Sequence, residues 1–164
     1  MCMKNYLTID IGRNWLRYAL ISEEIDVYKT GKEELNSFTS REDLFTTIKK
    51  ITDSFSSRTD SLAITMPGII DTDSGMAYSA GIYRFIRNEP LAKEISEYTG
   101  MKTIILNDAK AAALAEVGYG SLKGVHTGVM VMILGTGIGG AVIHDGKIFN
   151  GAHFGAGEFS YLTD

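Results

Sequence analysis

The sequence predicts a mixed α/β fold, in which helices flank a mixed β-sheet. Short apolar runs rich in β-branched residues indicate strands, and longer segments with apolar residues three and four positions apart indicate helices. The predicted order is three strands, then helix, strand, helix, strand and helix, followed by a glycine-rich β unit. We expect one domain over residues 1–118 and the beginning of a second, similar domain over residues 119–164.

Three strands are expected at the start of the chain. Residues 6–12 and 15–22 are apolar, β-rich runs, and only Arg13 and Asn14 separate them, which suits a tight hairpin turn. A third strand is expected over residues 25–30. The first three strands are therefore predicted to be antiparallel.

The middle of the chain alternates helices with strands. Residues 41–56 are expected to form a helix, because four apolar residues form one stripe there, and Ser40 with Asp43 forms a capping-box signature. The strand over residues 61–66 should end at the turn that contains Gly68. The remaining expected elements are a turn at 71–75, a helix at 90–99 before Gly100, a strand at 103–106, a helix at 108–118, and strands at 128–134 and 141–144.

The composition is that of an ordinary folded domain: 164 residues, 45% hydrophobic and 22% charged, with a net charge of −4. No dense Lys/Arg cluster is present, so nucleic acid is not expected as a partner. The single cysteine, Cys2, permits no disulfide within the chain, and the spacings of zinc ligands are absent. Without a signal-peptide or membrane-span pattern, we expect a cytoplasmic protein that binds neither zinc nor membranes.

A glycine-rich loop occupies residues 134–141. Gly135, Gly137 and Gly140 match the G-x-G-x-x-G pattern of dinucleotide-binding folds, but that pattern has to open a helix, and apolar β-branched residues follow here. The loop is therefore predicted to join two antiparallel strands. Glycine amides can approach a phosphate closely, and Thr136 adds a hydroxyl donor, so the loop is a candidate phosphate site. A plain glycine-rich hairpin is the alternative.

Asp10 ends the first predicted strand, just before the turn that contains Gly12. A carboxylate beside a phosphate-binding turn would repel the phosphate unless a cation lay between them. We therefore interpret Asp10 as a group associated with Mg²⁺, directly or through water. An aspartate that only caps the turn is the alternative, and the residues alone leave both open.

Four stretches of the chain resemble the ROK family of sugar kinases, which belongs to the actin, sugar kinase and Hsp70 ATPase superfamily. DIGRNWLR (10–17) resembles the first phosphate motif, DxGxTxxR/K, and NDAKAAALAE (107–116) resembles the ROK stretch NDANAAALGE. LGTGIGGAVIHDGKIFNGAHFGAGE (134–158) resembles the second phosphate motif and sugar loop. MPGIIDTDSG (66–75) is similar to the family's PGxVDxxxG segment, so the resemblance covers nearly the whole chain.

This resemblance implies an actin-like ATPase fold of the ribonuclease H-like kind and an ATP-dependent kinase that phosphorylates a hexose or hexose derivative on a hydroxyl. It also implies that Asn107 and Asp108 bind the sugar and that Asp108 is the general base. Asp108 follows a predicted strand and opens a helix, and a carboxylate can accept the proton of a sugar hydroxyl. An aspartate that only caps the helix is the alternative.

The remaining site residues also come from the resemblance. Glu158 matches the family's sugar-binding glutamate, and Tyr161 is a further candidate sugar ligand through its hydroxyl. Tyr161 stands where ROK proteins often carry a zinc-associated histidine, which supports the expectation of no zinc. The implied cofactors are ATP and Mg²⁺. The residues expected to bind them are Asp10, Gly12, Asn14, Gly135, Thr136, Gly137 and Gly139.

The sequence departs from the family pattern in three places. Arg13 and Asn14 replace Gly and Thr of the usual DIGGT; Asn14 keeps a donor, and Arg13 could pair with a phosphate or crowd the turn. Residues 79–84 replace an Asn-Leu segment that lies by the sugar in the family, which favours N-acylated amino sugars or β-glucosides over glucose. The chain also stops shortly after the sugar loop, whereas family members are nearly twice as long.

From its length we expect a truncated second domain, an isolated chain without activity, and exposed apolar strands that favour a homo-oligomer such as a dimer. Two other functions remain open. ROK proteins include sugar-responsive repressors with a helix-turn-helix module before the first phosphate motif, but only nine residues precede Asp10, which disfavours DNA binding. A non-catalytic sugar-binding fragment is the third possibility.

Overall fold

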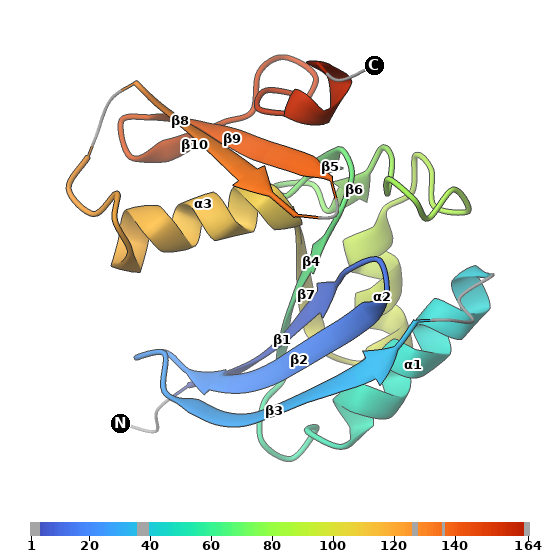
Figure 1. Ribbon diagram of the computed structural model, residues 1–164. Helices are drawn as coiled ribbons and strands as arrows, with labels where there is room; N and C mark the ends of the chain where they lie inside the picture. Colours follow the sequence, from blue (N-terminus) through green and yellow to red (C-terminus); the bar gives the residue numbers. More distant parts are fainter. Residues whose placement is uncertain (1–3, 36–39, 126–127, 136, 163–164) are drawn as a thin grey trace. The chain divides into compact units, whose positions relative to one another are not determined.

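The computed structural model describes residues 4–35, 40–125, 128–135 and 137–162. The chain forms two compact units, Met1–Leu106 and Asn107–Asp164, and each has its own hydrophobic core. Helices and strands alternate in the predicted order, so the mixed α/β fold class is confirmed (Figure 1).

The first unit is built on a five-stranded mixed sheet in the order β3-β2-β1-β4-β7. β1 (Asn5–Ile11), β2 (Trp15–Ser22) and β3 (Val27–Glu34) are antiparallel neighbours, and β4 (Ser61–Met66) lies parallel to β1. β7 (Lys102–Asn107) forms the other edge. The antiparallel opening of three strands is therefore confirmed, although the third strand continues to Glu34, beyond the expected limit at residue 30.

Two helices, α1 (Arg41–Asp53) and α2 (Leu91–Thr99), contribute to the core of the first unit. α1 begins at the predicted capping box, in which the backbone N–H groups of Asp43 and Ser40 each donate to the other's side chain at 3.2 Å. α2 ends at Gly100, whose φ of 77° is the left-handed conformation that suits a C-terminal glycine. The helices pack with alternate strand residues, and the fully buried apolar side chains include Leu7, Ile9, Ile11, Leu16, Leu20, Leu44, Ile48, Leu62 and Ile64.

The predicted turn after β4 depends on Gly68. Its φ is +122°, and a Cβ at this position would lie 2.1 Å from the backbone oxygen of Ser79, so only glycine fits without rearrangement. A short antiparallel pair follows, β5 (Ile70–Asp71) and β6 (Met76–Ala77), which agrees with the predicted turn between two extended pieces.

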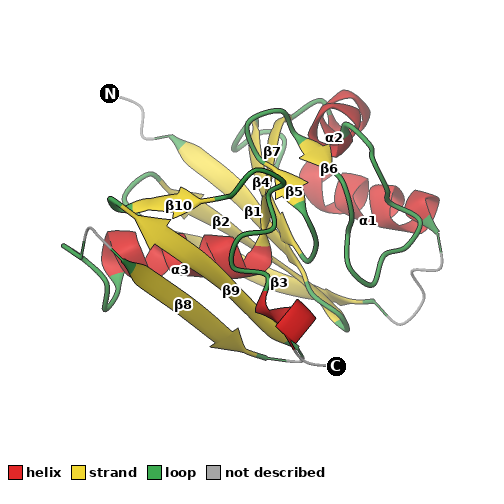
Figure 2. Cartoon of the chain, turned by 90° about the horizontal axis from the view of Figure 1, so that it is seen from above, coloured by secondary structure: helices red, strands yellow, loops and turns green. Residues whose placement is uncertain are grey.

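The second unit packs helix α3 (Asp108–Tyr119) against a three-stranded antiparallel sheet in the order β10-β9-β8 (Figure 2). The strands are β8 (Val129–Leu134), β9 (Ile138–His144) and β10 (Lys147–Phe149), and a short 3₁₀ helix, η1 (Phe159–Leu162), follows them. The small core of this unit consists of Ala113, Ala141 and Ile143, with Val117, Val129, Val131 and Ile148 packed against it.

Along the chain, the first compact unit ends at Leu106 and the second begins at Asn107, whereas the sequence predicted a domain limit at residue 118. The sequence placed α3 with the first unit, whereas in the structure α3 packs on β9 and β10. Gly139 of β9 permits this packing, because a Cβ there would lie only 2.8 Å from the Cβ of Ala109. The division of the complete protein into domains at residues 118 and 119 stays a prediction.

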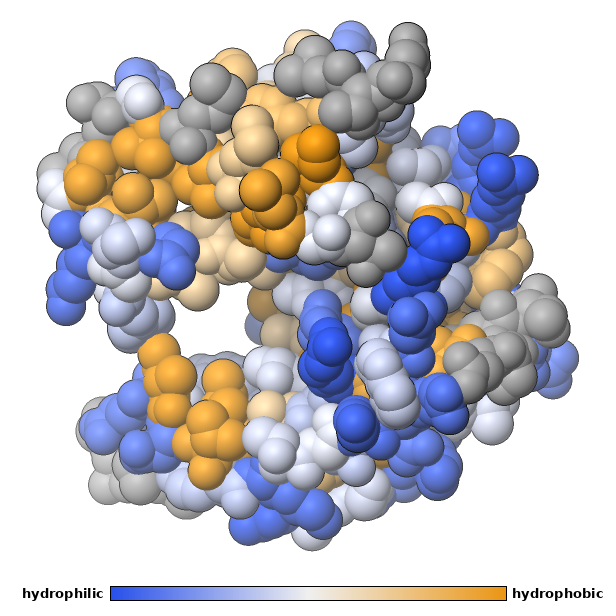
Figure 3. Space-filling view, viewed as in Figure 1, coloured by the Kyte–Doolittle hydropathy of each residue, from blue (hydrophilic) through white to orange (hydrophobic). Residues whose placement is uncertain are grey.

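The strands of the second unit expose apolar side chains. Met132 and Leu134 on β8 are 60% and 76% exposed, Phe149 on β10 is also exposed, and Figure 3 shows apolar surface over this sheet. Exposed apolar strands favour association, which supports the expected homo-oligomer as a prediction. Among the described residues, no helix combines the length and apolar character needed to cross a membrane.

Candidate functional site

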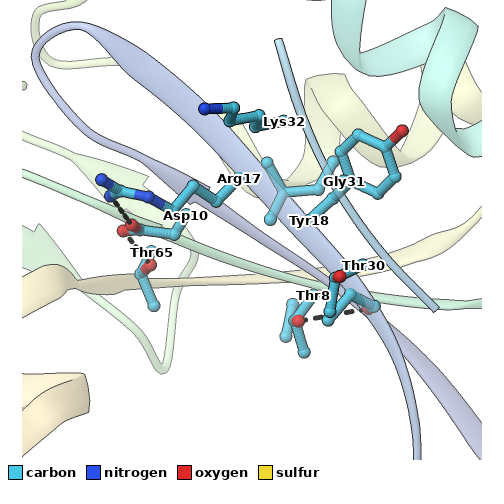
Figure 4. A pocket seen from close by; sticks show the side chains of 11 residues that line it. Thr8, Asp10, Arg17, Tyr18, Thr30, Gly31, Lys32 and Thr65 are labelled. Atoms are coloured by element: carbon cyan, nitrogen blue, oxygen red, sulfur yellow. Dashed lines mark hydrogen bonds and ion pairs between the residues drawn. The ribbon is translucent and has the colours of Figure 1, made fainter. Parts of the chain in front are cut away.

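Asp10 is held by the strands on either side of β1. One carboxylate oxygen accepts a hydrogen bond from Thr65 Oγ1 at 2.9 Å, and the other lies 3.4 Å from Arg17 Nη1 (Figure 4). Both partners lie directly opposite Asp10 in the strand register. The turn that follows is closed by a backbone hydrogen bond, from Gly12 N to Trp15 O at 3.0 Å. The Asp10 carboxylate is therefore held by residues of the neighbouring strands.

An open pocket of about 720 Å³ lies on the face of the sheet that carries Asp10. Asp10, Arg17 and Thr65 lie together in one part of it, and Thr8 and Thr30 lie apart from them (Figure 4). Asp10 is 44% exposed, so its carboxylate is accessible to a ligand. The pocket is lined by Thr8, Ile9, Asp10, Arg17, Tyr18, Ala19, Thr30, Gly31, Lys32, Ala63 and Thr65.

Asp10 fits a magnesium ion that is held mainly by phosphates and water. Mg²⁺ in nucleotide sites commonly uses only one or two carboxylates and keeps several waters. Within the described part of the chain, no three His, Cys, Asp or Glu side chains gather into a group that could hold a metal by themselves. A magnesium ion at Asp10 would compete with Arg17 for the carboxylate.

Tyr83 supports the first turn in a way that the sequence analysis missed. Its buried hydroxyl donates a hydrogen bond to the carbonyl oxygen of Gly12. Burial, and secondly the charge of Asp10, raise the pKa of Tyr83 to about 12, so the hydroxyl remains a donor at neutral pH. Tyr83 belongs to residues 79–84, which the sequence analysis related only to substrate choice. Arg13 and Asn14, which follow Gly12 in this turn, are both exposed.

The second glycine loop is a hairpin, as predicted. Leu134 pairs with Ile138, and the amide of Gly135 donates to the carbonyl oxygen of Gly137 at 2.9 Å. Both glycines are exposed, and an added Cβ would meet one oxygen at 3.9 Å at Gly135 and no atom within 4 Å at Gly137. Packing therefore does not explain these two exposed glycines. Thr136 lies outside the described residues.

Gly139 and Gly140, in contrast, lie within β9, where packing accounts for them. Gly139 faces Ala109 of α3, and a Cβ at Gly140 would lie 2.4 Å from the ring of Phe159. Two of the glycines that suggested a phosphate loop are therefore explained by close packing within the second unit.

The polar residues of the second unit meet at the junction of β7 and α3. Asn107 is the N-cap: its Oδ1 accepts from the amide of Lys110 at 2.9 Å, and its Nδ2 donates to Glu158 Oε1 at 3.4 Å. Asp108 is the first helical residue, and its Oδ1 accepts from the amide of Ala109 at 2.8 Å. Asn107 therefore fills the N-cap position, and Asp108 accepts a hydrogen bond from a further amide of the first turn.

Glu158 interacts with the charges around it. Burial raises the pKa of Glu158, the nearby Lys110 ammonium opposes that rise, and the negative charge of Asp108 adds to it. The three groups therefore form one electrostatic cluster within the second unit. Tyr161 lies in η1 with an exposed side chain, and its amide donates to the carbonyl oxygen of Glu158 at 3.3 Å.

Lys110 is the second residue that the sequence analysis missed. It is only 1% exposed, and its ammonium donates to Asn150 Oδ1 at 3.0 Å and to the carbonyl oxygen of Phe154 at 2.7 Å. Burial lowers the pKa of Lys110, and Glu158 opposes that shift. The available signal was a lysine where the ROK stretch NDANAAALGE has its second asparagine.

These units define an actin-like ATPase fold, and solved structures share it. A ROK family glucokinase from Streptomyces griseus, in complex with glucose and AMPPNP, superposes with a TM-score of 0.80 at 27% identity, over 94% of this chain and 49% of that chain. A ROK family transcriptional regulator, homologous to the Escherichia coli Mlc protein, superposes with a TM-score of 0.80 at 25% identity, over 94% of this chain and 40% of the regulator.

The chain belongs to the ROK family, whose sequence model matches residues 6–162. A glucokinase from Halalkalibacterium halodurans is 28% identical over an alignment of 165 positions, gaps included. The alignment covers 96% of this chain and 49% of the glucokinase. A β-glucoside kinase from Klebsiella pneumoniae is 38% identical over 106 residues, covering 64% of this chain and 35% of that kinase. The chain thus spans about half the length of the curated glucokinase that it matches.

Proposed function

We propose that the protein is an ATP-dependent sugar kinase in which Asp108 accepts the proton of the sugar hydroxyl during phosphoryl transfer. The cluster of Asn107, Asp108 and Glu158 carries this proposal, because it gathers two carboxylates and an amide at the start of one helix. A sugar hydroxyl is a poor nucleophile, and a fixed carboxylate can take its proton as the new bond forms.

The other two residues of the cluster would bind the sugar. Glu158 can accept hydrogen bonds from sugar hydroxyls, and an ionised acceptor makes such bonds stronger than a neutral one. Asn107 already donates to Glu158, which limits the orientations of that carboxylate. Tyr161 is exposed and offers a further hydroxyl to a sugar.

ATP would be held by the two glycine turns, with Mg²⁺ at Asp10. Gly12 and Asn14 belong to the first turn, and Gly135, Thr136 and Gly137 belong to the second. We assign Gly139 to packing instead, because it faces Ala109.

Gly137→Ala in the full-length gene product should weaken binding of ATP·Mg²⁺ by about tenfold, because the methyl group would keep a phosphate from the backbone amides. Stability should change by less than about 0.5 kcal/mol, since no atom lies within 4 Å of the added Cβ. Calorimetric titration with ATP·Mg²⁺ and thermal denaturation measure the two effects. Gly118→Ala, on the exposed face of α3 with equally open space, is the control and should leave ATP affinity unchanged. Equal ATP affinity in wild type and Gly137→Ala would contradict the assignment.

N-acylated amino sugars and β-glucosides are the proposed substrates, ahead of glucose. Residues 79–84 and Tyr161 differ from the family's glucokinase pattern, and the similarity to a β-glucoside kinase supports the same choice. A coupled assay of ADP release by the full-length gene product, with these sugars and glucose side by side, tests the proposal. A wide preference for glucose would show that the substrate assignment is wrong.

The isolated 164-residue chain should bind sugar weakly, bind ATP more weakly, and show no detectable turnover, because phosphoryl transfer depends on complete positioning of both substrates. We also propose a cytoplasmic location and a homodimer.

A sugar-sensing regulator is the second candidate function, supported by the similarity to the ROK transcriptional regulator. Such a protein would bind sugar without releasing ADP, so the same assay separates the two.

A further inference from the structure

Among the residues that the structure describes, Lys110 is the one charged residue that is buried, with 1% of its surface exposed. It projects from the first turn of α3, a helix in which Ala109 and Ala113 are also buried. Burying an ammonium is costly unless it is hydrogen-bonded and compensated by charge. If the side chain served only to fill space, an apolar residue could do so without the cost of burying a charge. The polar contacts of Lys110 therefore need an explanation.

The Lys110 ammonium donates to two acceptors in the segment 150–158, which joins β10 to η1. One is the side chain of Asn150 and the other is the backbone carbonyl of Phe154. The two contacts therefore fix the segment near its beginning and near its middle. Glu158, the proposed sugar ligand, lies at its end.

The segment has internal order that these contacts support. The amide of Ala156 donates to Asn150 O at 3.1 Å, and the amide of Glu158 donates to Gly155 O at 3.1 Å. Phe154 has a φ of +60°, which is unfavourable for a large non-glycine residue. A conformation of this kind persists only when neighbouring contacts hold it, and the ammonium of Lys110 binds the carbonyl of this same residue.

We propose that Lys110 is a positioning residue, whose buried ammonium fixes the segment 150–158 on α3 so that Glu158 is held in place to bind the sugar. This inference rests on the proposed function of Glu158. The positive charge of Lys110 also lies close enough to stabilise Glu158 in its ionised form, which is the stronger acceptor for a hydroxyl. Lys110 itself is too buried to be a sugar ligand.

The test uses the full-length gene product with Lys110→Met, which keeps the length of the side chain but removes its charge and donors. Hydrogen exchange of the amides of residues 150–158 should become faster by about tenfold or more. KM for the preferred sugar should rise by about tenfold or more, while kcat should change by less than about threefold. Lys110→Arg should recover most of both effects, and Lys123→Met, at an exposed lysine of the same unit, should show neither.

The outcomes separate this inference from the proposed function. Unchanged exchange and unchanged KM in Lys110→Met would overturn it, and so would a loss confined to kcat. If the wild type phosphorylates no sugar, the proposed function fails, while exchange of residues 150–158 still tests the anchoring by Lys110. If Lys110→Met does not fold, Asn150→Ala is the second variant, because it removes one acceptor of the ammonium and leaves the charge buried. Faster hydrogen exchange near Phe154 together with a raised KM for the sugar supports the inference. Wild-type values of both quantities overturn it.

Discussion

Asp108→Asn in the full-length gene product is expected to lower turnover by about 10²–10⁴-fold, the usual range for loss of a general base. Asparagine has nearly the same shape but cannot accept the proton of a sugar hydroxyl. The helix start should survive, because the N-cap hydrogen bond comes from Asn107. KM for the sugar should therefore change much less than kcat, which is the pattern of an interaction made mainly in the transition state.

A steady-state assay with the preferred sugar measures this effect. Asp145→Asn is a suitable control, because Asp145 is an exposed aspartate in the β9–β10 turn, with a φ of +49° that asparagine also tolerates. The control should keep the wild-type rate and stability. Near-normal turnover of Asp108→Asn would show that Asp108 is not the base.

Gly157→Ala is expected to lower the free energy of unfolding by at least about 2 kcal/mol, from a strained φ and from overpacking together. Gly157 has a φ of +87°, and an added Cβ would lie 2.6 Å from the Cα of Ala141 in β9. Backbone atoms cannot move away as a flexible side chain can. The segment would have to shift, and Glu158, the next residue, would shift with it, so sugar affinity should also fall by about tenfold or more.

Gly155→Ala is the matched control in the same segment. No atom lies within 4 Å of a Cβ at Gly155, and its φ is outside the left-handed range, so stability should change by less than about 0.5 kcal/mol. Chemical denaturation and calorimetric titration with sugar compare the two variants. A Gly157→Ala protein with wild-type stability and sugar affinity would mean that the contact with β9 does not fix the position of Glu158.

Local patterns explain why so much of the fold could be predicted. The capping box at Ser40 and Asp43 and the C-terminal glycine of α2 are decided by residues close in sequence, and both are confirmed. β2 and β4 match their predicted limits because alternating burial extends to the ends of each apolar run. α1 ends at Asp53 and not at the predicted residue 56, where the apolar stripe continues through Phe55 although the helix does not.

The features that could not be predicted depend on contacts between distant residues. The partnership of Thr65 with Asp10 requires the parallel register of β1 and β4, and the contact between Tyr83 and Gly12 crosses 71 positions of the chain. The packing role of Gly139 requires α3 to lie on β9. In the sequence, Lys110 is not distinguishable from an exposed lysine of a helix. Its role depends on contacts with the segment 150–158, which lies about 40 residues further along the chain.

Transfer of a phosphoryl group from ATP to a sugar is tested most directly by detection of the phosphorylated product. The full-length gene product should be incubated with ATP, Mg²⁺ and each candidate sugar, and the products identified by mass spectrometry. We expect a sugar that carries one added phosphoryl group, formed in equal amount with ADP by the wild type and not formed by Asp108→Asn. Sugar binding without any phosphorylated sugar would contradict the kinase assignment and would favour a sugar-sensing regulator.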